Sequence, residues 1–184
     1  MEDNGKINEA WQRVRLYLPN MMGLYNTYHP QTLAEWQNIV NQNVDMGAIT
    51  EALTEITDST PEDAETWVNE RVIIDTYQGG KMQDKARNII EENGYSVMIP
   101  TEQEDKQGVD LIAHKGKDKI NIQIKPRSFF MCRSRVCKCK QELLRNKCKA
   151  NKILLMTYDN GKFDKSAKNT YLDNIDNLIK RWQK

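Results

Sequence analysis

The chain lacks long apolar segments and low-complexity stretches. No apolar run approaches the roughly 18 residues of a membrane span, so no membrane partner is expected. The first residues, Met1-Glu2-Asp3-Asn4, lack the basic and then apolar pattern of a signal peptide. We therefore expect a cytoplasmic protein. The two histidines, His29 and His114, are isolated in the sequence and do not suggest a ligand set or a general base.

What the chain does have suffices for one folded domain. Its 184 residues can form one full hydrophobic core but are too few for two ordinary domains. Hydrophobic residues make up 39% of the chain and charged residues 29%, which favours a globular protein over a disordered one. One domain with a helical extension is the expected organisation.

The net charge of +1 conceals a strong asymmetry along the chain. Residues 1–70 hold 3 lysines and arginines against 12 acidic residues, whereas residues 111–184 hold 19 against 6. Clustered cations neutralise phosphates and release counterions, so the C-terminal half is suited to a polyanion such as DNA. The alternative is a basic surface opposed by an acidic one within the same protein.

Apolar residues at helical spacing predict helices over residues 7–18, 32–43 and 46–57. The segment Thr60-Pro61-Glu62-Asp63 has a capping hydroxyl, a proline at the first helical position and acidic residues in the first turn, so it predicts the start of another helix. We expect Gly79-Gly80 to interrupt or restart that helix and Asn93-Gly94 to end its continuation. These patterns divide the chain into an N-terminal helical extension, residues 1–60, and a core, residues 61–184.

After Gly94 the pattern changes from helical to extended. Runs rich in valine and isoleucine at residues 95–99, 109–114 and 119–125 predict three strands, the last two joined as a hairpin. A basic helix is expected over 138–149, a buried strand over 152–158 and a terminal helix over 172–182. The order from residue 80 is helix, three strands, helix, strand. The predicted class is therefore α/β, with a mixed α+β sheet in an αβββαβ core.

Three polar residues on the second and third strands form the candidate site. Asp110 leads into one strand, and Gln123 and Lys125 project from the same face of the next because side chains alternate along a strand. Asp110 and the amide oxygen of Gln123 could hold Mg²⁺, with Mn²⁺ as a substitute, and the ion would lower the pKa of a bound water. Lys125 would orient that water and offset charge in the transition state. This chemistry hydrolyses phosphodiesters.

The segment from residue 80 to 158 resembles the PD-(D/E)xK nuclease superfamily, which includes type II restriction endonucleases and Holliday-junction resolvases. In that superfamily an aspartate opens the second strand and an acid-x-lysine motif closes the third. Asp110 and Lys125 match these positions, Val109 replaces the proline, and Gln123 stands where an acid is usual. The resemblance implies a restriction-endonuclease-like fold and metal-dependent DNA cleavage.

The resemblance extends upstream of the strands. Resolvase-like members carry a glycine followed by a helix with an acidic residue, about three turns before a glycine–aromatic pair. Gly80, Gln83 and Gly94-Tyr95 fall at similar places. The resemblance therefore makes Gln83 a further catalytic candidate, again with an amide in place of an acid. The alternative is an ordinary surface glutamine.

A basic segment, residues 127–149, follows the candidate catalytic strand. Its cations are well placed to contact phosphates or guanine edges, and the alternative is a solvated basic helix. The candidate DNA-binding residues are Arg127, Arg133, Arg135, Lys138 and Lys140.

All four cysteines lie in the same segment, at Cys132, Cys137, Cys139 and Cys148. Four thiolates could bind structural Zn²⁺, but the gaps of four, one and eight residues fit common zinc knuckles poorly. Free thiols are therefore favoured over zinc, and an iron–sulfur cluster is favoured less than either.

The leading functional prediction is a Mg²⁺-dependent type II restriction endonuclease that acts on double-stranded DNA as a homodimer, since two copies can cut both strands symmetrically. One alternative is a structure-selective nuclease, such as a junction resolvase or a phage recombination enzyme. Another is a DNA-binding protein on the same fold that is inactive because Gln83 and Gln123 replaced acids.

Overall fold

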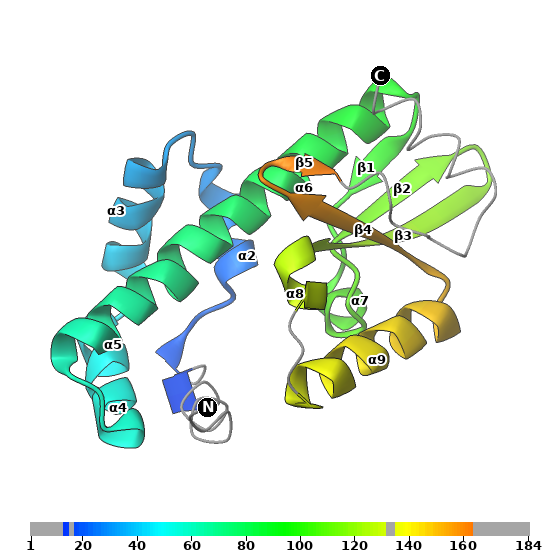
Figure 1. The fold of residues 1–184 in the computed structure, drawn as a ribbon. Helices are drawn as coiled ribbons and strands as arrows, with labels where there is room; N and C mark the ends of the chain where they lie inside the picture. The colour runs from blue at the N-terminus through cyan, green and yellow to red at the C-terminus, as the bar shows by residue number, and fades with distance from the viewer. Residues whose placement is uncertain (1–12, 15–16, 132–134, 164–184) are drawn as a thin grey trace. The chain divides into compact units, whose positions relative to one another are not determined.

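A computed structural model describes residues 13, 14, 17–131 and 135–163 (Figure 1). The chain separates into two compact units, Met1–Gly80 and Lys81–Lys184. The boundary lies within helix α6 (Asp75–Glu92), whereas the sequence placed it between residues 60 and 61. Each unit is described by itself below. No helix within the described ranges is long and apolar enough to cross a membrane.

The described part of the first unit is helical. Two predicted helices are confirmed, because α3 spans Leu33–Asn43 and α4 spans Met46–Thr57. The Thr60 prediction is also confirmed, since its side chain accepts a hydrogen bond from the backbone of Asp63 at the start of α5 (Pro61–Val68). A π-helix (Asn69–Ile74) then leads into α6. The short helix α2 (Met21–Tyr28) was not predicted, and most of the predicted helix 7–18 lies outside the described residues.

Aromatic residues form the centre of this unit's core. Tyr25 and Trp36 are fully buried, and their rings meet edge to face with centroids 5.6 Å apart. Gly80 does not interrupt α6, so that prediction was wrong. A Cβ at Gly80 would collide with the Tyr25 ring. The glycine therefore allows close packing within a continuous helix.

The second unit is built on a five-stranded sheet whose strands lie in sequence order. The strands are β1 (Ser96–Met98), β2 (Leu111–Lys115), β3 (Asp118–Pro126), β4 (Ile153–Asp159) and β5 (Lys162–Phe163). All neighbours pair antiparallel except β3 and β4, which are parallel. The predicted hairpin between the second and third strands is confirmed by the β2–β3 pairing.

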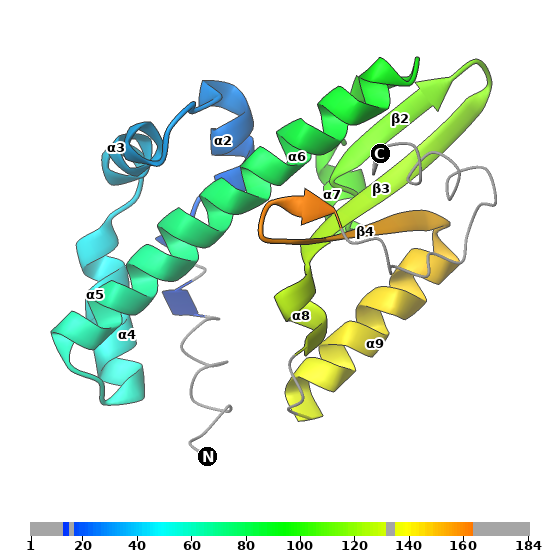
Figure 2. The ribbon, with the colours of Figure 1, turned by 45° about the horizontal axis from the view of Figure 1, so that its top comes forward.

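Figure 2 shows a helix on each side of the sheet, and two apolar clusters show that alternating strand residues pack against different helices. Ile122 and Ile124 pack in one apolar cluster with the α6 residues Met82, Ala86 and Ile90. Helix α9 (Arg135–Ala150) contributes Leu144 and Cys148 to a second cluster, together with Ile112 and Ile153. Gln123 and Lys125 alternate with the isoleucines of the first cluster, so they belong to the face of α9.

The order α6, β1, β2, β3, α9, β4 is the αβββαβ core that the sequence predicted. The second unit therefore has a restriction-endonuclease-like α+β fold. Two short helices were not predicted, α7 (Glu102–Lys106) before β2 and α8 (Arg127–Met131) after β3. The predicted terminal helix 172–182 lies outside the described residues.

Candidate active site

Asp110 and Gln123 meet where β2 begins. The backbone N–H of Asp110 donates to the carbonyl of Ile122 at 2.7 Å, which extends the β2–β3 pairing by one residue. The Asp110 Oδ2 atom accepts two hydrogen bonds, from Gln123 Nε2 at 2.7 Å and from the backbone N–H of Ile124 at 2.6 Å. The carboxylate is thus fixed by strand β3, while its Oδ1 atom accepts no hydrogen bond from the described residues.

Lys125 is the third member of this cluster. It lies two residues beyond Gln123 on the same face of β3 and is half-buried. Burial raises the pKa of Asp110 above its ordinary value, and the positive charge of Lys125 opposes that rise. The two hydrogen bonds to Asp110 also lower its pKa, whereas the nearby charge of Asp105 raises it. The carboxylate therefore favours a bound cation or proton.

Gly108 determines how Gln123 lies. Its φ of +87° belongs to the left-handed region, and a Cβ there would lie 2.6 Å from Gln123 Oε1. Gln123 is only 3% exposed, so its carboxamide has little space to retreat. The absence of a side chain at residue 108 lets the Gln123 oxygen face the loop while its nitrogen faces Asp110.

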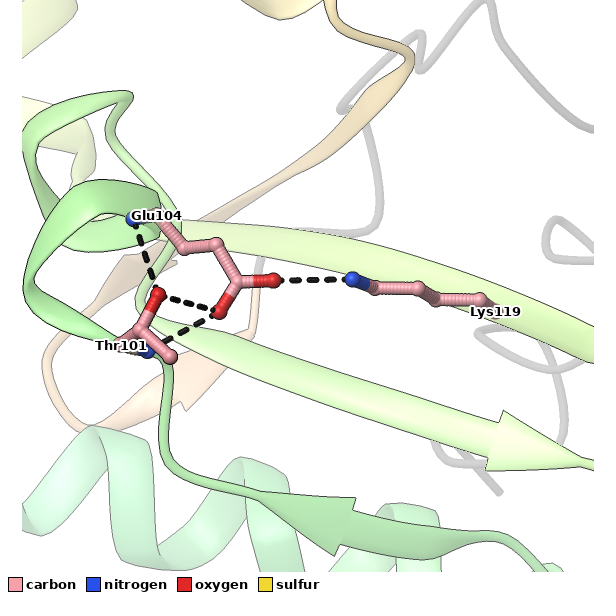
Figure 3. Close-up of polar contacts among 3 residues, drawn as sticks. All are labelled: Thr101, Glu104 and Lys119. Atoms are coloured by element: carbon pink, nitrogen blue, oxygen red, sulfur yellow. Dashed lines mark hydrogen bonds and ion pairs between the residues drawn. The ribbon is translucent and has the colours of Figure 1, made fainter.

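The loop that carries Gly108 is held by helix α7. Thr101 and Glu104 form a capping box at its N-terminus, and Lys119 Nζ contacts Glu104 Oε1 at 2.8 Å (Figure 3). The hydrogen bonds from Lys119 and from the Thr101 backbone and side chain lower the pKa of Glu104 to about 2. At the other end, the backbone N–H of Gly108 donates to the carbonyl of Asp105 at 2.7 Å. These contacts fix the loop between α7 and Asp110.

Three further residues near the site were not singled out as catalytic candidates from the sequence. Asp105 acts electrostatically on Asp110. Cys148 is a buried free thiol whose pKa is raised by burial, with smaller effects from Lys125 and Asp110. Lys147 donates from Nζ to the carbonyl of Lys106 at 2.6 Å. The spacing of Leu144, Lys147 and Cys148 along a helix is the signal that could have found the last two.

Gln83 is not brought into this cluster by any described contact. It is buried in α6 at 8% exposure, next to Met82, which packs on the side of Ile122 and Ile124. Gln123 and Lys125 lie on the other face of the sheet. No hydrogen bond or ion pair among the described residues joins Gln83 to Asp110, and its catalytic role stays a prediction.

A model of the MjaI restriction endonuclease family matches residues 6–165, which is most of the chain. The chain belongs to this family. No curated protein and no solved structure matches it. The match includes the sheet, both flanking helices and the Asp110–Gln123–Lys125 cluster. The PD-(D/E)xK resemblance is compatible with a restriction endonuclease family but stays an interpretation of the motif.

The donor set of this family member suits a hard cation that retains water. Mg²⁺ uses one or two carboxylates together with waters and substrate phosphates. Asp110 Oδ1, which accepts no hydrogen bond from the described residues, could coordinate such an ion. Gln123 presents Nε2 rather than Oε1 to Asp110, so its carboxamide would have to rotate to offer an oxygen. Asp110 and Gln123 therefore fit an ion that is completed by the substrate, and they do not form an all-protein cage.

The described candidate DNA-binding residues lie on α8 and α9. Arg127 follows β3 directly and is exposed, as are Lys138 and Lys140. Gln141 Nε2 donates to the carbonyl of Phe129 at 2.8 Å and joins the two helices. Arg133 lies outside the described residues, and the side chain of Arg135, at the start of α9, is not described. The exposed cations therefore continue from the end of β3 onto α9.

The cysteines are not gathered into a described metal site. Cys139 is exposed on α9, whereas Cys148 is buried against the sheet, and both are free thiols. Within the described ranges no three histidine, cysteine, aspartate or glutamate residues are placed to share a metal ion. Cys137 is disulfide-bonded, so the expectation of free thiols was wrong at this residue. Cys132 lies outside the described ranges, and zinc binding by the four cysteines stays a prediction.

Proposed function

We propose that this chain is a metal-dependent endonuclease that hydrolyses phosphodiester bonds in double-stranded DNA, as a type II restriction enzyme does. The observation that carries the proposal is the contact of Asp110 with Gln123 beside Lys125, within a member of the MjaI restriction endonuclease family. The exposed cations of α8 and α9 support a polyanionic substrate, because phosphates dominate the affinity of proteins for DNA. Cleavage of duplex DNA requires one cut in each DNA strand. Two copies of the chain can make these cuts symmetrically, so a homodimer is part of the proposal.

Asp110 and Gln123 would hold Mg²⁺, or Mn²⁺ in its place, through Asp110 Oδ1 and the amide oxygen. When bound, the ion would polarise a phosphoryl oxygen and lower the pKa of a bound water molecule. Asp110 is suited to this role because burial already makes its bare negative charge unfavourable. A cation at Oδ1 relieves that cost and leaves the hydrogen bond from the Ile124 N–H to Oδ2 in place, whereas the bond from Gln123 is given up when its carboxamide turns the oxygen towards the ion.

Lys125 would act on the attacking water and on the developing charge. It is half-buried beside Asp110, where its ammonium orients a water molecule and donates to a phosphoryl oxygen that gains negative charge. Gln123 supplies an oxygen without a charge. Its Nε2 donates to Asp110 in the described structure, so the carboxamide positions the carboxylate before any ion arrives.

The test is a digestion of plasmid and phage DNA by the purified full chain with Mg²⁺ or Mn²⁺, followed by sequencing of the ends. Discrete fragments with a common end sequence are expected, and chelation should abolish them. Asp110→Asn and Lys125→Met serve as matched inactive variants. A four-way junction substrate tests the structure-selective alternative, since preferential junction cutting would replace the restriction proposal. DNA binding without cleavage in either metal would instead support an inactive binding protein.

A further inference from the structure

Lys147 lies beside Gln123 in the site yet has no part in the mechanism above. It is half-buried on α9, and its Nζ atom donates to the carbonyl of Lys106 at 2.6 Å. The same nitrogen is 3.8 Å from the position that a Cβ on Gly108 would occupy, and Gln123 Oε1 is 2.6 Å from that position. The ammonium of α9 and the carboxamide of β3 therefore border the same small space.

The two lysines of the site approach it from different elements. Lys125 comes from β3 and acts on Asp110, whereas Lys147 comes from α9 on the side of Gln123. Cys148 connects the two sides, because Lys125, Asp110 and Lys147 all influence the pKa of its buried thiol. These residues form one cluster, although they come from separate parts of the sequence.

Lys147 has binding capacity that the described contacts do not use. A lysine ammonium carries three N–H donors, and only the bond to the Lys106 carbonyl is observed. None of the described carboxylates forms an ion pair with it. An acid at residue 123 would place a negative charge next to this ammonium, but the neutral carboxamide leaves the positive charge available to an anion.

We propose that Lys147 is a phosphate-binding residue of this site, whose ammonium holds a non-bridging oxygen of the phosphodiester beside Gln123. Lysine binds phosphate as a point charge and needs no bidentate geometry. The bond to Lys106 positions the ammonium before the substrate arrives. This assignment rests on the proposed function, but binding at Lys147 does not require a bound metal ion.

Inorganic phosphate tests the assignment without metal or cleavage. Thermal unfolding of the full chain is followed in chelator, with and without phosphate, at constant ionic strength set by sodium chloride. A ligand of the folded state raises the midpoint, by on the order of 3 °C at roughly ten times its Kd. Lys147→Gln should lose this rise, and Lys147→Arg should regain it. Lys117→Gln removes the same charge from an exposed turn and should respond like the wild type.

The glutamine variant removes the charge and keeps a polar N–H donor on a side chain that is one bond shorter than lysine. An equal phosphate response in the wild type and Lys147→Gln would overturn the assignment, as would an equal loss in Lys117→Gln. With DNA as substrate, Lys147→Gln should lower kcat about 10- to 100-fold at saturating DNA. A wild type that responds to phosphate through Lys147 but cuts no DNA would contradict the proposed nuclease activity alone.

Discussion

Asp110 and Gln123 face each other at the end of the β2–β3 pairing that lies away from the hairpin turn, and the Gln123 amide donates to the carboxylate at 2.7 Å. A glutamate at residue 123 could not make this bond and would repel Asp110. The amide therefore changes the unliganded site from a pair of like charges into a hydrogen-bonded unit. The consequences for stability and for metal binding can be measured separately.

Asp110→Asn should make the metal-free protein more stable at neutral pH while abolishing cleavage. Burial raises the folded-state pKa of Asp110, so its contribution to stability is present below the unfolded pKa and is lost as pH rises through the folded pKa. At neutral pH the ionised carboxylate is therefore a cost that asparagine removes, and the asparagine oxygen can still accept both hydrogen bonds. Melting temperatures at several pH values check this, and a variant that is less stable at neutral pH would contradict it.

Gln123→Glu should strengthen metal binding and weaken the metal-free fold. The substitution removes the hydrogen bond to Asp110 and places a second negative charge beside it, which a divalent cation would offset. Isothermal titration with Mg²⁺ and Mn²⁺, together with melting curves in chelator, measures both effects. If the metal affinity of the variant equals that of the wild type, the residue at 123 does not contact the ion.

Gly108→Ala should destabilise the protein by about 2 kcal/mol and lower cleavage, because backbone strain and a collision act together. The added methyl group would approach Gln123 Oε1 at a φ of +87°. Gly116→Ala is a matched control, since its φ is +61° and nothing lies within 4 Å of the added Cβ. The control should show the backbone strain alone and retain activity. Equal losses in the two variants would mean that Gln123 does not depend on Gly108.

Most of the sheet could be predicted from the sequence because the pattern of apolar residues and the positions of the turn residues indicate the same strands. The isoleucines of β3 alternate with polar residues, β2 begins with a short apolar run, and Gly116 marks the hairpin turn between the two strands. Asp110, Gln123 and Lys125 could be placed on one face because strand alternation requires only the correct register. Helices α7 and α8 were missed because five residues are too few to show a helical period.

Other features depend on contacts that sequence spacing does not encode. Gly80 could be taken for a helix breaker because the Tyr25 ring, which requires a glycine there, is distant in sequence. Lys147 is separated by 41 residues from Lys106, whose carbonyl holds it. Pattern analysis grouped Cys148 with three other cysteines as a potential zinc ligand. Burial of its thiol against the sheet depends on the rotation of α9, which the cysteine spacing alone does not specify.

Replacing Lys138 and Lys140 together by glutamine should weaken DNA binding and reduce its salt dependence. Both residues are exposed on α9. Each phosphate contact contributes about 0.9 to the magnitude of the slope of the logarithm of affinity against the logarithm of salt concentration. The magnitude of this slope should therefore fall by up to about 2 in the double variant. Filter binding in chelator at several salt concentrations measures the slope. An unchanged slope would identify this part of α9 as a solvated basic surface.

Glu104→Gln should destabilise the protein at neutral pH and have a progressively smaller effect as the pH falls. The pKa of Glu104 is lowered to about 2 in the folded state from an ordinary value of 4.5, so its contribution is fully present above the unfolded value and is lost as pH falls through the folded value. Glutamine can preserve part of the capping box but not the ion pair with Lys119. The variant should therefore differ most from the wild type above about pH 5, and the difference should shrink towards pH 2.

Melting curves of both proteins across this range measure the difference, and high salt should reduce it at neutral pH because the ion pair is exposed to screening. Glu102→Gln provides a control on the same helix, since Glu102 pairs with Lys106 within α7 and does not join the helix to β3. That variant should leave Asp110 and Gly108 in place. If Glu104→Gln lowers cleavage at pH 7 and Glu102→Gln does not, the connection of α7 to β3 positions the loop that carries Gly108. Equal activity in both variants would show that the loop holds its place without Glu104.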